Sequence, residues 1–91
     1  MDLTRVKVVK KDGTKEDFNV QKVISAISKS AERAMITFSK AELNFICEFV
    51  EEKVQELAQE LIPITQMHNI VDGALEKVNP LVAKSYRAYR K

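Results

Sequence analysis

The sequence predicts an α+β fold in which a small N-terminal β-hairpin caps a bundle of four α-helices. Apolar residues alternate with charged ones on either side of Asp12-Gly13, and apolar residues recur at helical spacing through the rest of the chain. Only two Gly and two Pro interrupt these 91 residues. Because the strand pattern precedes all the helical patterns, we expect an α+β arrangement and a single domain over residues 1–91.

The predicted hairpin covers about residues 4–18. Its turn is Asp12-Gly13, which supplies the positive φ that tight turns require. A two-residue loop would pair Val8 with Asp17, whereas a three-residue loop or a bulge at Gly13 places the even-numbered residues on one face. That face would have an apolar base and a charged rim. It consists of Val6, Val8, Lys10, Glu16, Phe18 and Val20.

The first two helices are predicted over about residues 20–35 and 40–61. Asn19 is a favourable N-cap for the first, and Ser39 with Glu42 three residues later forms a capping box for the second. Apolar side chains follow at i, i+3 and i+4 spacing, which predicts one buried stripe on each helix. These stripes are Val20, Val23, Ile24, Ile27, Ala31 and Ala34, and then Leu43, Ile46, Val50, Val54, Leu57 and Leu61.

The last two helices are predicted over about residues 65–78 and 80–91, and Pro63 is expected to end the helix before them. Thr65 is the predicted cap of the third helix. Asn79 is the predicted cap of the fourth, with a proline at the first helical position. The apolar stripe of the third helix contains Met67, Ile70, Val71, Ala74, Leu75 and Val78.

Charge is distributed unevenly along the chain, although the net charge is only +2. Residues 1–15 carry +3 and residues 79–91 carry +4, while residues 16–78 carry −5. If the fold brings the two ends together, their lysines and arginines would form a pocket suited to a polyphosphate. The alternative is two separate solvated faces, and charge alone leaves both interpretations open.

Several classes of protein are disfavoured. No apolar run approaches the roughly 18 residues that span a bilayer, and the N-terminus lacks a secretory signal, so we expect no membrane partner and a cytoplasmic location. The single cysteine, Cys47, excludes an internal disulfide and a multi-cysteine zinc site within this chain. The sequence shows no nucleophile beside a base and no clustered metal ligands, so we expect no catalytic residues and no metal site.

Lys10, Lys11 and Lys22 are candidate ligands for an anion. The hairpin would bring Lys10 and Lys11 beside the first turn of the first helix, where Lys22 lies. Free backbone N–H groups and the helix dipole favour an anion at that place. On spacing alone, the same lysines could equally be solvated side chains that keep a small domain soluble.

The segment around these lysines resembles the start of the ATP-cone, a regulatory module found mostly at the N-terminus of ribonucleotide reductases. The family motif reads roughly V-x-K-R-D-G-x-x-x-x-F-x-x-x-K-I, and residues 8–13 with Phe18 and Lys22 follow it. Lys11 replaces the usual arginine, which removes a bidentate phosphate contact. The resemblance continues at residues 64–65 and in the closing segment 82–90, and so covers nearly the whole chain.

The resemblance implies a nucleotide site whose residues are carried over by motif position. They are Val8, Lys10, Lys11, Glu16, Asn19, Lys22, Ile64, His68 and Lys91. The lysines would neutralise a triphosphate, because each offers charged N–H donors. Glu16 and Asn19 can form hydrogen bonds with adenine or ribose edges.

The same resemblance implies a regulatory domain that senses ATP and dATP and controls the overall activity of a ribonucleotide reductase, with ATP activating and dATP inhibiting. The effector would be ATP or dATP, accompanied by Mg²⁺. The partners would be the catalytic domain or other subunits of the reductase, with nucleotide-dependent oligomerisation through the cone. The chain itself would not be an enzyme, and the closing tyrosines and arginines are reminiscent of the anaerobic, glycyl-radical class.

A second interpretation is a basic helical domain that binds nucleic acid or regulates transcription. The basic ends favour it, but Asp72 and Glu76 on the polar side of the third helix do not, so we expect no nucleic-acid partner. A zinc-ribbon repressor of reductase genes also carries a cone, but these residues lack the cysteines of such a ribbon. A third interpretation, a helical protein-interaction module, predicts an exposed apolar patch and no response to nucleotides.

Overall fold

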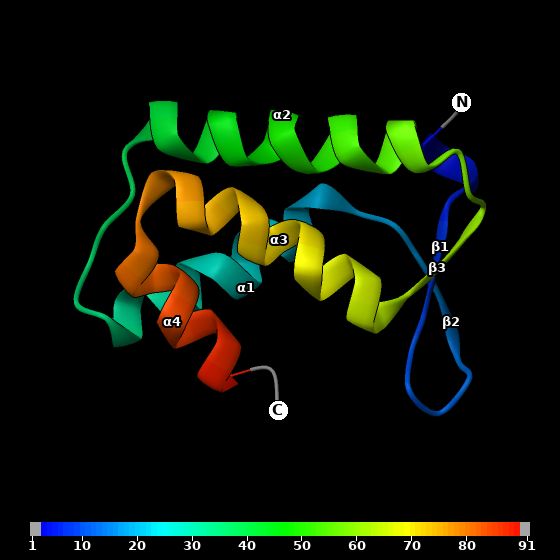
Figure 1. The fold of residues 1–91 in the computed structure, drawn as a ribbon, viewed down its shortest axis with the longest axis horizontal. Helices are drawn as coiled ribbons and strands as arrows, with labels where there is room; N and C mark the ends of the chain where they lie inside the picture. Colours follow the sequence, from blue (N-terminus) through cyan, green and yellow to red (C-terminus); the bar gives the residue numbers. More distant parts are fainter. Residues whose placement is uncertain (1–2, 90–91) are drawn as a thin grey trace.

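The computed structural model describes residues 3–89 and has an α+β fold, as the sequence predicts. In Figure 1 the strands lie at one end of the helices, and the connection from α1 to α2 lies at the other end, beside the start of α4. The elements in chain order are a 3₁₀ helix (Leu3–Arg5), β1 (Lys7–Val9), β2 (Lys15–Asp17), α1 (Val20–Arg33), α2 (Lys40–Leu57), β3 (Leu61–Pro63), α3 (Ile64–Val78) and α4 (Pro80–Tyr89).

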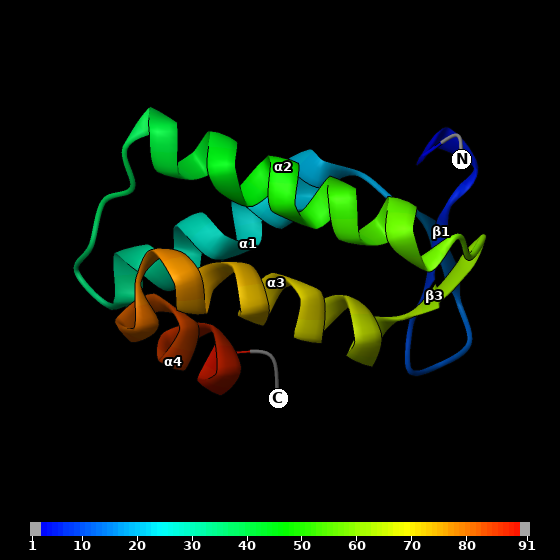
Figure 2. The same ribbon diagram turned by 45° about the horizontal axis from the view of Figure 1, so that its top comes forward.

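The helices pack around α3, which contacts α2 on one side and α4 on the other, while α4 also packs on α1. Figures 1 and 2 show α2 and α4 on opposite sides of α3. The predicted stripes of α2 and α3 supply much of the core, since their central members are fully buried. The buried apolar residues are Val6, Val8, Ile27, Ala31, Phe38, Ile46, Val50, Val54, Ile62, Met67, Val71, Ala74, Leu75, Val82, Ala83 and Tyr86.

The hairpin has the odd-length loop that the sequence predicts. Val8 pairs with Glu16, and the Lys10 amide donates a hydrogen bond to the Thr14 carbonyl at 2.8 Å, which leaves three residues in the loop. Gly13 has a φ of 88°, in the left-handed region that glycine adopts without a steric penalty. Val8 therefore points into the core, with Glu16 beside it on the same face of the sheet.

The sheet contains a third strand that the sequence analysis did not predict. β3 pairs in parallel with β1, with Ile62 opposite Val8, so the strand order is β2-β1-β3. The predicted second helix, 40–61, is therefore wrong at its end, because α2 stops at Leu57 and Ala58 turns the chain with a φ of 50°. The expected hairpin cap is replaced by a three-stranded sheet whose last strand connects α2 to α3.

Three of the four predicted helix caps are confirmed. The Asn19 side chain accepts a hydrogen bond from the amide two residues later at 2.8 Å, and Ser39 forms the expected capping box. The Asn79 side chain accepts a hydrogen bond from the amide two residues later at 3.0 Å. Thr65 is not a cap, because α3 already begins at Ile64 and no side chain caps it. The fourth helix is described as far as residue 89.

α1 ends at Arg33, two residues before the predicted boundary, in a turn that requires a left-handed residue. The Met35 amide donates to the Glu32 carbonyl at 3.0 Å, and the Ile36 amide donates to the Ala31 carbonyl at 2.8 Å. These are the two hydrogen bonds of a Schellman motif, in which the left-handed residue is usually glycine. Met35 takes that position with a φ of 59°, and the residue is 93% exposed.

Replacing Met35 with glycine should therefore stabilise the fold. We expect the free energy of unfolding to rise by about 0.5 kcal/mol, because relief of the left-handed strain exceeds the entropic cost of glycine. Ala34→Gly is the matched control, since Ala34 has a φ of −84° and gains no such relief. Urea unfolding measures both variants, and a Met35→Gly protein less stable than the unmutated chain would contradict the prediction.

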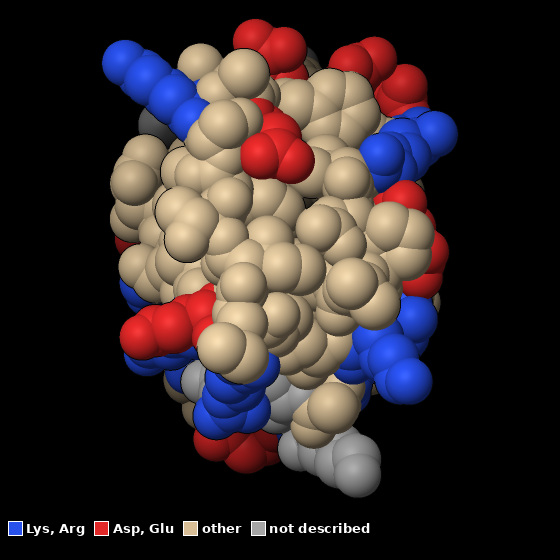
Figure 3. Space-filling model, turned by 90° about the vertical axis from the view of Figure 1, so that its left-hand side faces the viewer, with Lys and Arg blue, Asp and Glu red and all other residues tan. Residues whose placement is uncertain are grey.

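The end of the molecule opposite the sheet exposes two large apolar side chains. Met35 lies in the connection from α1 to α2, and Leu81, at the start of α4, is 65% exposed. Figure 3 shows this end as a broad uncharged surface with acidic and basic side chains toward its margins. The described part of this face therefore offers no continuous basic surface for a nucleic-acid backbone.

Candidate functional site

A pocket opens between the sheet and helices α1, α3 and α4. Its volume is about 200 Å³, below the roughly 300–1,000 Å³ that encloses a whole small-molecule ligand. It can therefore enclose part of a nucleotide-sized ligand while the rest crosses the rim. The lining residues are Val8, Glu16, Asp17, Phe18, Asn19, Lys22, Val23, Ala26, Ile64, Met67, His68, Val71 and Tyr86.

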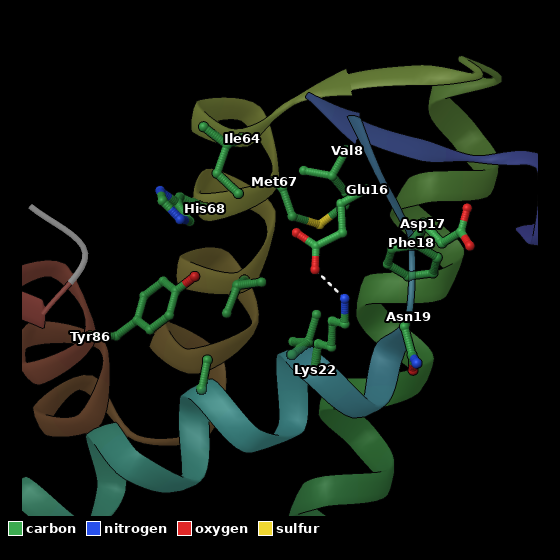
Figure 4. Close-up of a pocket in the computed structure, with 13 residues that line it drawn as sticks. Val8, Glu16, Asp17, Phe18, Asn19, Lys22, Ile64, Met67, His68 and Tyr86 are labelled. Atoms are coloured by element: carbon green, nitrogen blue, oxygen red, sulfur yellow. Dashed lines mark hydrogen bonds and ion pairs between the residues drawn. The ribbon is translucent and has the colours of Figure 1, made fainter. Parts of the chain in front are cut away.

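Six of the nine predicted site residues line this pocket. They are Val8, Glu16, Asn19, Lys22, Ile64 and His68. Figure 4 shows that they come from the hairpin, the start of α1 and the first turns of α3. Segments that are more than 40 residues apart in the sequence therefore meet around one cavity.

The other three predicted residues lie differently. The Lys10 ammonium is at the rim, where its Nζ lies 3.1 Å from Oε2 of Glu16, although Lys10 is not a wall residue. Lys11 is exposed in the hairpin loop and does not line the pocket. Lys91 lies outside the described residues, so its contact with phosphate stays a prediction.

The polar side of the pocket is organised by Glu16. This residue lies in β2, and its carboxylate pairs with the ammonium groups of Lys22 in α1 and Lys10 just after β1. The hydrogen bond from Lys22, followed by that from Lys10, holds the pKa of the Glu16 carboxyl below its usual value. Around Glu16 the rim therefore carries two ammonium groups and one carboxylate, while Asp17, the second lining carboxylate, pairs with Lys7.

Asn19 has two roles at the edge of the pocket. Its side-chain oxygen caps α1, so its amide nitrogen, with two N–H donors, remains available to a ligand. The backbone N–H groups beside it are already used, because that of Gln21 donates to the Asn19 side chain and that of Lys22 donates to the Asn19 carbonyl, so the donors that remain at this corner are the Asn19 amide and the Lys22 ammonium. The sequence therefore folds this corner into a set of donors suited to an anion or to a base edge.

Of the apolar walls of the pocket, only Val8 and Ile64 were predicted from the sequence. Met67 and Val71 belong to the predicted stripe of α3, but helical spacing does not show that the stripe also faces a cavity. Tyr86 of α4 is a buried residue that also lines the pocket. Its ring meets that of His68 edge to face, with centroids 5.9 Å apart.

Arg87, one of the basic residues of segment 79–91, does not line the pocket. Its Nη1 lies 2.8 Å from Oδ1 of Asp72 and 2.7 Å from Oε1 of Glu76, both on α3. Hydrogen bonds to Glu76 and then to Asp72 raise the pKa of Arg87. This guanidinium therefore joins α4 to α3.

Other features of the described residues add no reactive group. Between residues 3 and 89, no cluster of three or more His, Cys, Asp or Glu side chains is placed to hold a metal ion. Cys47 is a half-buried free cysteine in α2, and burial, with Glu51 and Glu48 nearby, raises the pKa of its thiol. Over the same residues, no helix has the length and apolar character needed to cross a membrane.

Glu16 should make the stability of the fold sensitive to acid. Its folded-state pKa lies below the ordinary glutamate value of 4.5, so its ionised form stabilises the folded state. That contribution to stability is fully present when the pH is above the ordinary pKa of glutamate. It is lost as the pH falls through the lowered pKa that Glu16 has in the folded state. Glu16→Gln should therefore lower the melting temperature at neutral pH and flatten its decline in acid. Circular dichroism melts at stepwise lower pH measure this, and an unchanged decline would contradict it.

The fold and the pocket together define a small α+β domain with a cationic rim over an apolar cavity. The family model for the ATP cone domain matches residues 6–91. The chain belongs to the ATP-cone family, as the hairpin motif predicts, and adenine-nucleotide binding is the general property of that family.

The chain is also similar to several curated proteins named Transcriptional repressor NrdR. One from Limosilactobacillus fermentum is 32% identical over 91 residues, an alignment that covers 96% of this chain and 59% of the relative. One from Exiguobacterium is 30% identical over 94 residues and covers 99% of this chain and 59% of the relative. One from Prochlorococcus marinus is 29% identical over 87 residues, an alignment that covers 94% of this chain and 54% of the relative. The chain thus spans less than three fifths of these relatives.

These relatives correct part of the functional prediction. They are named as transcriptional repressors, whereas the sequence analysis expected a ribonucleotide reductase as parent and partner. A reductase parent is therefore not supported. The names of the relatives also speak against the expectation that the protein has no nucleic-acid partner. Their names describe regulators and not enzymes, which agrees with a regulatory role.

Proposed function

We propose that this ATP-cone binds an adenine nucleotide in the pocket between the hairpin, α1 and α3 and acts as the sensor of a transcriptional regulator. One observation carries the proposal: the motif residues converge on an apolar cavity with a cationic rim. The named repressors support the regulatory context. In such a bacterial regulator the cone would work in the cytoplasm.

The proposed orientation follows from the chemistry of the pocket. The base and sugar enter the apolar cavity, where Phe18 and Met67 contribute walls and Asn19 offers its amide. The phosphates extend over the rim toward Lys10 and Lys22, whose ammonium groups form charge-assisted hydrogen bonds. Mg²⁺ would arrive with the triphosphate, since this ion is commonly held by nucleotide phosphates and water.

In the proposed regulator, the surface that contacts DNA lies outside the cone. Several cations here are already paired with carboxylates, including Lys7 with Asp17 and Arg87 with Asp72. The repressors are also longer than this chain, which covers 59% of the two most similar ones described above. We therefore assign the nucleotide signal to this domain and DNA contact to another part of the regulator or to a partner chain.

A sensor of this kind must distinguish ATP from dATP, which differ only in the ribose 2′-hydroxyl. For a switch, the two nucleotides must favour different arrangements by a coupling free energy of about 1–3 kcal/mol. The arrangements we propose are different oligomers formed through the cone. Light scattering with each nucleotide tests this, and identical masses with ATP and dATP would contradict it.

Isothermal titration calorimetry of the purified chain tests the proposed function. ATP and dATP should bind, GTP should bind more weakly, and duplex DNA should not bind tightly to the isolated cone. A dissociation constant of about 1 mM corresponds to a binding free energy of only about −4 kcal/mol. Absence of adenine-nucleotide binding even at that concentration would overturn the proposal. Tight DNA binding with no nucleotide response would favour a nucleic-acid-binding domain in its place.

A further inference from the structure

One carboxylate holds both ammonium groups at the rim of the pocket. Lys10 Nζ lies 3.1 Å from Oε2 of Glu16, and Lys22 Nζ pairs with Oε1 of the same carboxylate. Figure 4 shows Glu16 and Lys22 pointing toward each other across the pocket mouth. The two cations that the proposed function assigns to phosphate are therefore already engaged by an anion of the protein.

Resting on the proposed function, we infer that Glu16 sets the phosphate affinity of the site: its carboxylate occupies Lys10 and Lys22 until the phosphates of a nucleotide take its place. An ammonium group donates three hydrogen bonds, and a triphosphate brings many more acceptor oxygens than one carboxylate. Phosphates seated at both lysines would lie beside Glu16, and like charges repel at such distances. The Glu16 side chain therefore turns away when phosphate binds.

The surroundings of Glu16 keep this internal anion in place. Its side chain is 30% exposed, less than the side chains of Lys10 and Lys22 that cover it. The same two hydrogen bonds lower its pKa, so it is fully charged at neutral pH. Once displaced, the carboxylate can accept a hydrogen bond from a ribose hydroxyl or an adenine amino group. One residue would then oppose phosphate before binding and contact the nucleoside afterwards.

Asp17 provides a local control for this inference. It is next to Glu16 in β2, but it pairs with Lys7, and Figure 4 shows its carboxylate pointing away from the centre of the pocket. Removal of its charge changes the local electrostatic potential without releasing Lys10 or Lys22. Glu56→Gln, which breaks an ion pair with Lys53 on α2, is a distant control with the same chemistry.

The test is calorimetric titration of four proteins, the unmutated chain, Glu16→Gln, Asp17→Asn and Glu56→Gln, with inorganic triphosphate, adenosine and ATP. Glu16→Gln should bind inorganic triphosphate about fivefold more tightly. This is the change in affinity expected when triphosphate no longer has to break a moderately exposed ion pair. The same variant should not gain affinity for adenosine. Asp17→Asn should show a smaller gain for triphosphate, and Glu56→Gln should show none. Circular dichroism confirms that each variant is folded.

The outcomes separate this inference from the proposed function. If the unmutated chain binds ATP but Glu16→Gln binds triphosphate equally or more weakly, Glu16 organises the lysines and does not compete with phosphate, and the inference fails alone. An equal gain in Asp17→Asn would also overturn it, because general charge would then explain the effect. If the unmutated chain binds neither ATP nor triphosphate, both the proposed function and the inference fail.

Discussion

Replacing Lys10 with alanine should weaken ATP binding by about tenfold, the effect of losing one charge-assisted hydrogen bond at a partly exposed site. The Lys10 ammonium lies at the pocket rim beside Glu16, where the proposed orientation places the phosphates. Its loss removes a phosphate ligand and leaves Glu16 paired with Lys22 alone. Adenosine binding should change little, because the nucleoside lies deeper in the cavity. Calorimetry with ATP and adenosine measures both effects.

Lys15→Ala is the matched control for this prediction. Lys15 lies in β2 of the same hairpin and carries the same charge, but it is exposed and does not line the pocket. Its removal should change ATP affinity less than about twofold, as expected for a screened charge at a distance. Equal losses in the two variants would show that the net charge of the hairpin, and no defined phosphate site, governs binding.

Replacing Ile62 with alanine should lower the free energy of unfolding by about 3 kcal/mol. Ile62 is fully buried at the centre of β3 and pairs with Val8 of β1. Truncation leaves a cavity where the sheet meets the helices, and both lost burial and poor packing contribute to the cost. Urea unfolding measures the loss, and Ile62→Val, with an expected cost of about 1 kcal/mol, remains measurable if the alanine variant does not fold.

Leu61→Ala tests whether this cost arises from the strand geometry. Leu61 precedes Ile62 in β3, and the residue is 46% exposed, with its side chain on the opposite face of the strand. Its truncation should cost less than about 1 kcal/mol, because little apolar surface is uncovered. Had residue 61 continued the stripe of α2, as the sequence pattern predicts, Leu61→Ala would be the more destabilising change. Equal costs for the two variants would contradict the third strand.

Local sequence patterns predicted the α+β class and most of the individual helices and caps. The helical stripes, the caps at Asn19, Ser39 and Asn79, and the odd hairpin loop each depend on residues close in sequence. β3 could not be predicted in this way, since a three-residue strand has no measurable period and exists through pairing with β1, more than 50 residues earlier. No glycine marks the end of α2, where Ala58 adopts the left-handed conformation.

The pocket, too, was predicted in part from sequence patterns and in part could not be. Of the polar residues predicted from the resemblance, Glu16, Asn19, Lys22 and His68 do meet around one cavity, whereas Lys11 does not line it and Asp17, which does, was not predicted. Of the apolar walls only Val8 and Ile64 were predicted, because an apolar side chain at helical spacing fits a filled core as well as a cavity wall. Charge along the chain could not assign Arg87 either, because its partners Asp72 and Glu76 on α3 are set by how α4 packs on α3.

The central claim is that the pocket between the hairpin, α1 and α3 binds an adenine nucleotide, and an NMR titration of the ¹⁵N-labelled chain with ATP tests it most directly. The largest amide shift changes should fall in the hairpin around Val8, in the first turn of α1 and around His68 in α3. The exposed face of α2 around Lys53 should show none. Absence of shift changes, or changes centred on α2 and the end around Met35, would contradict the claim.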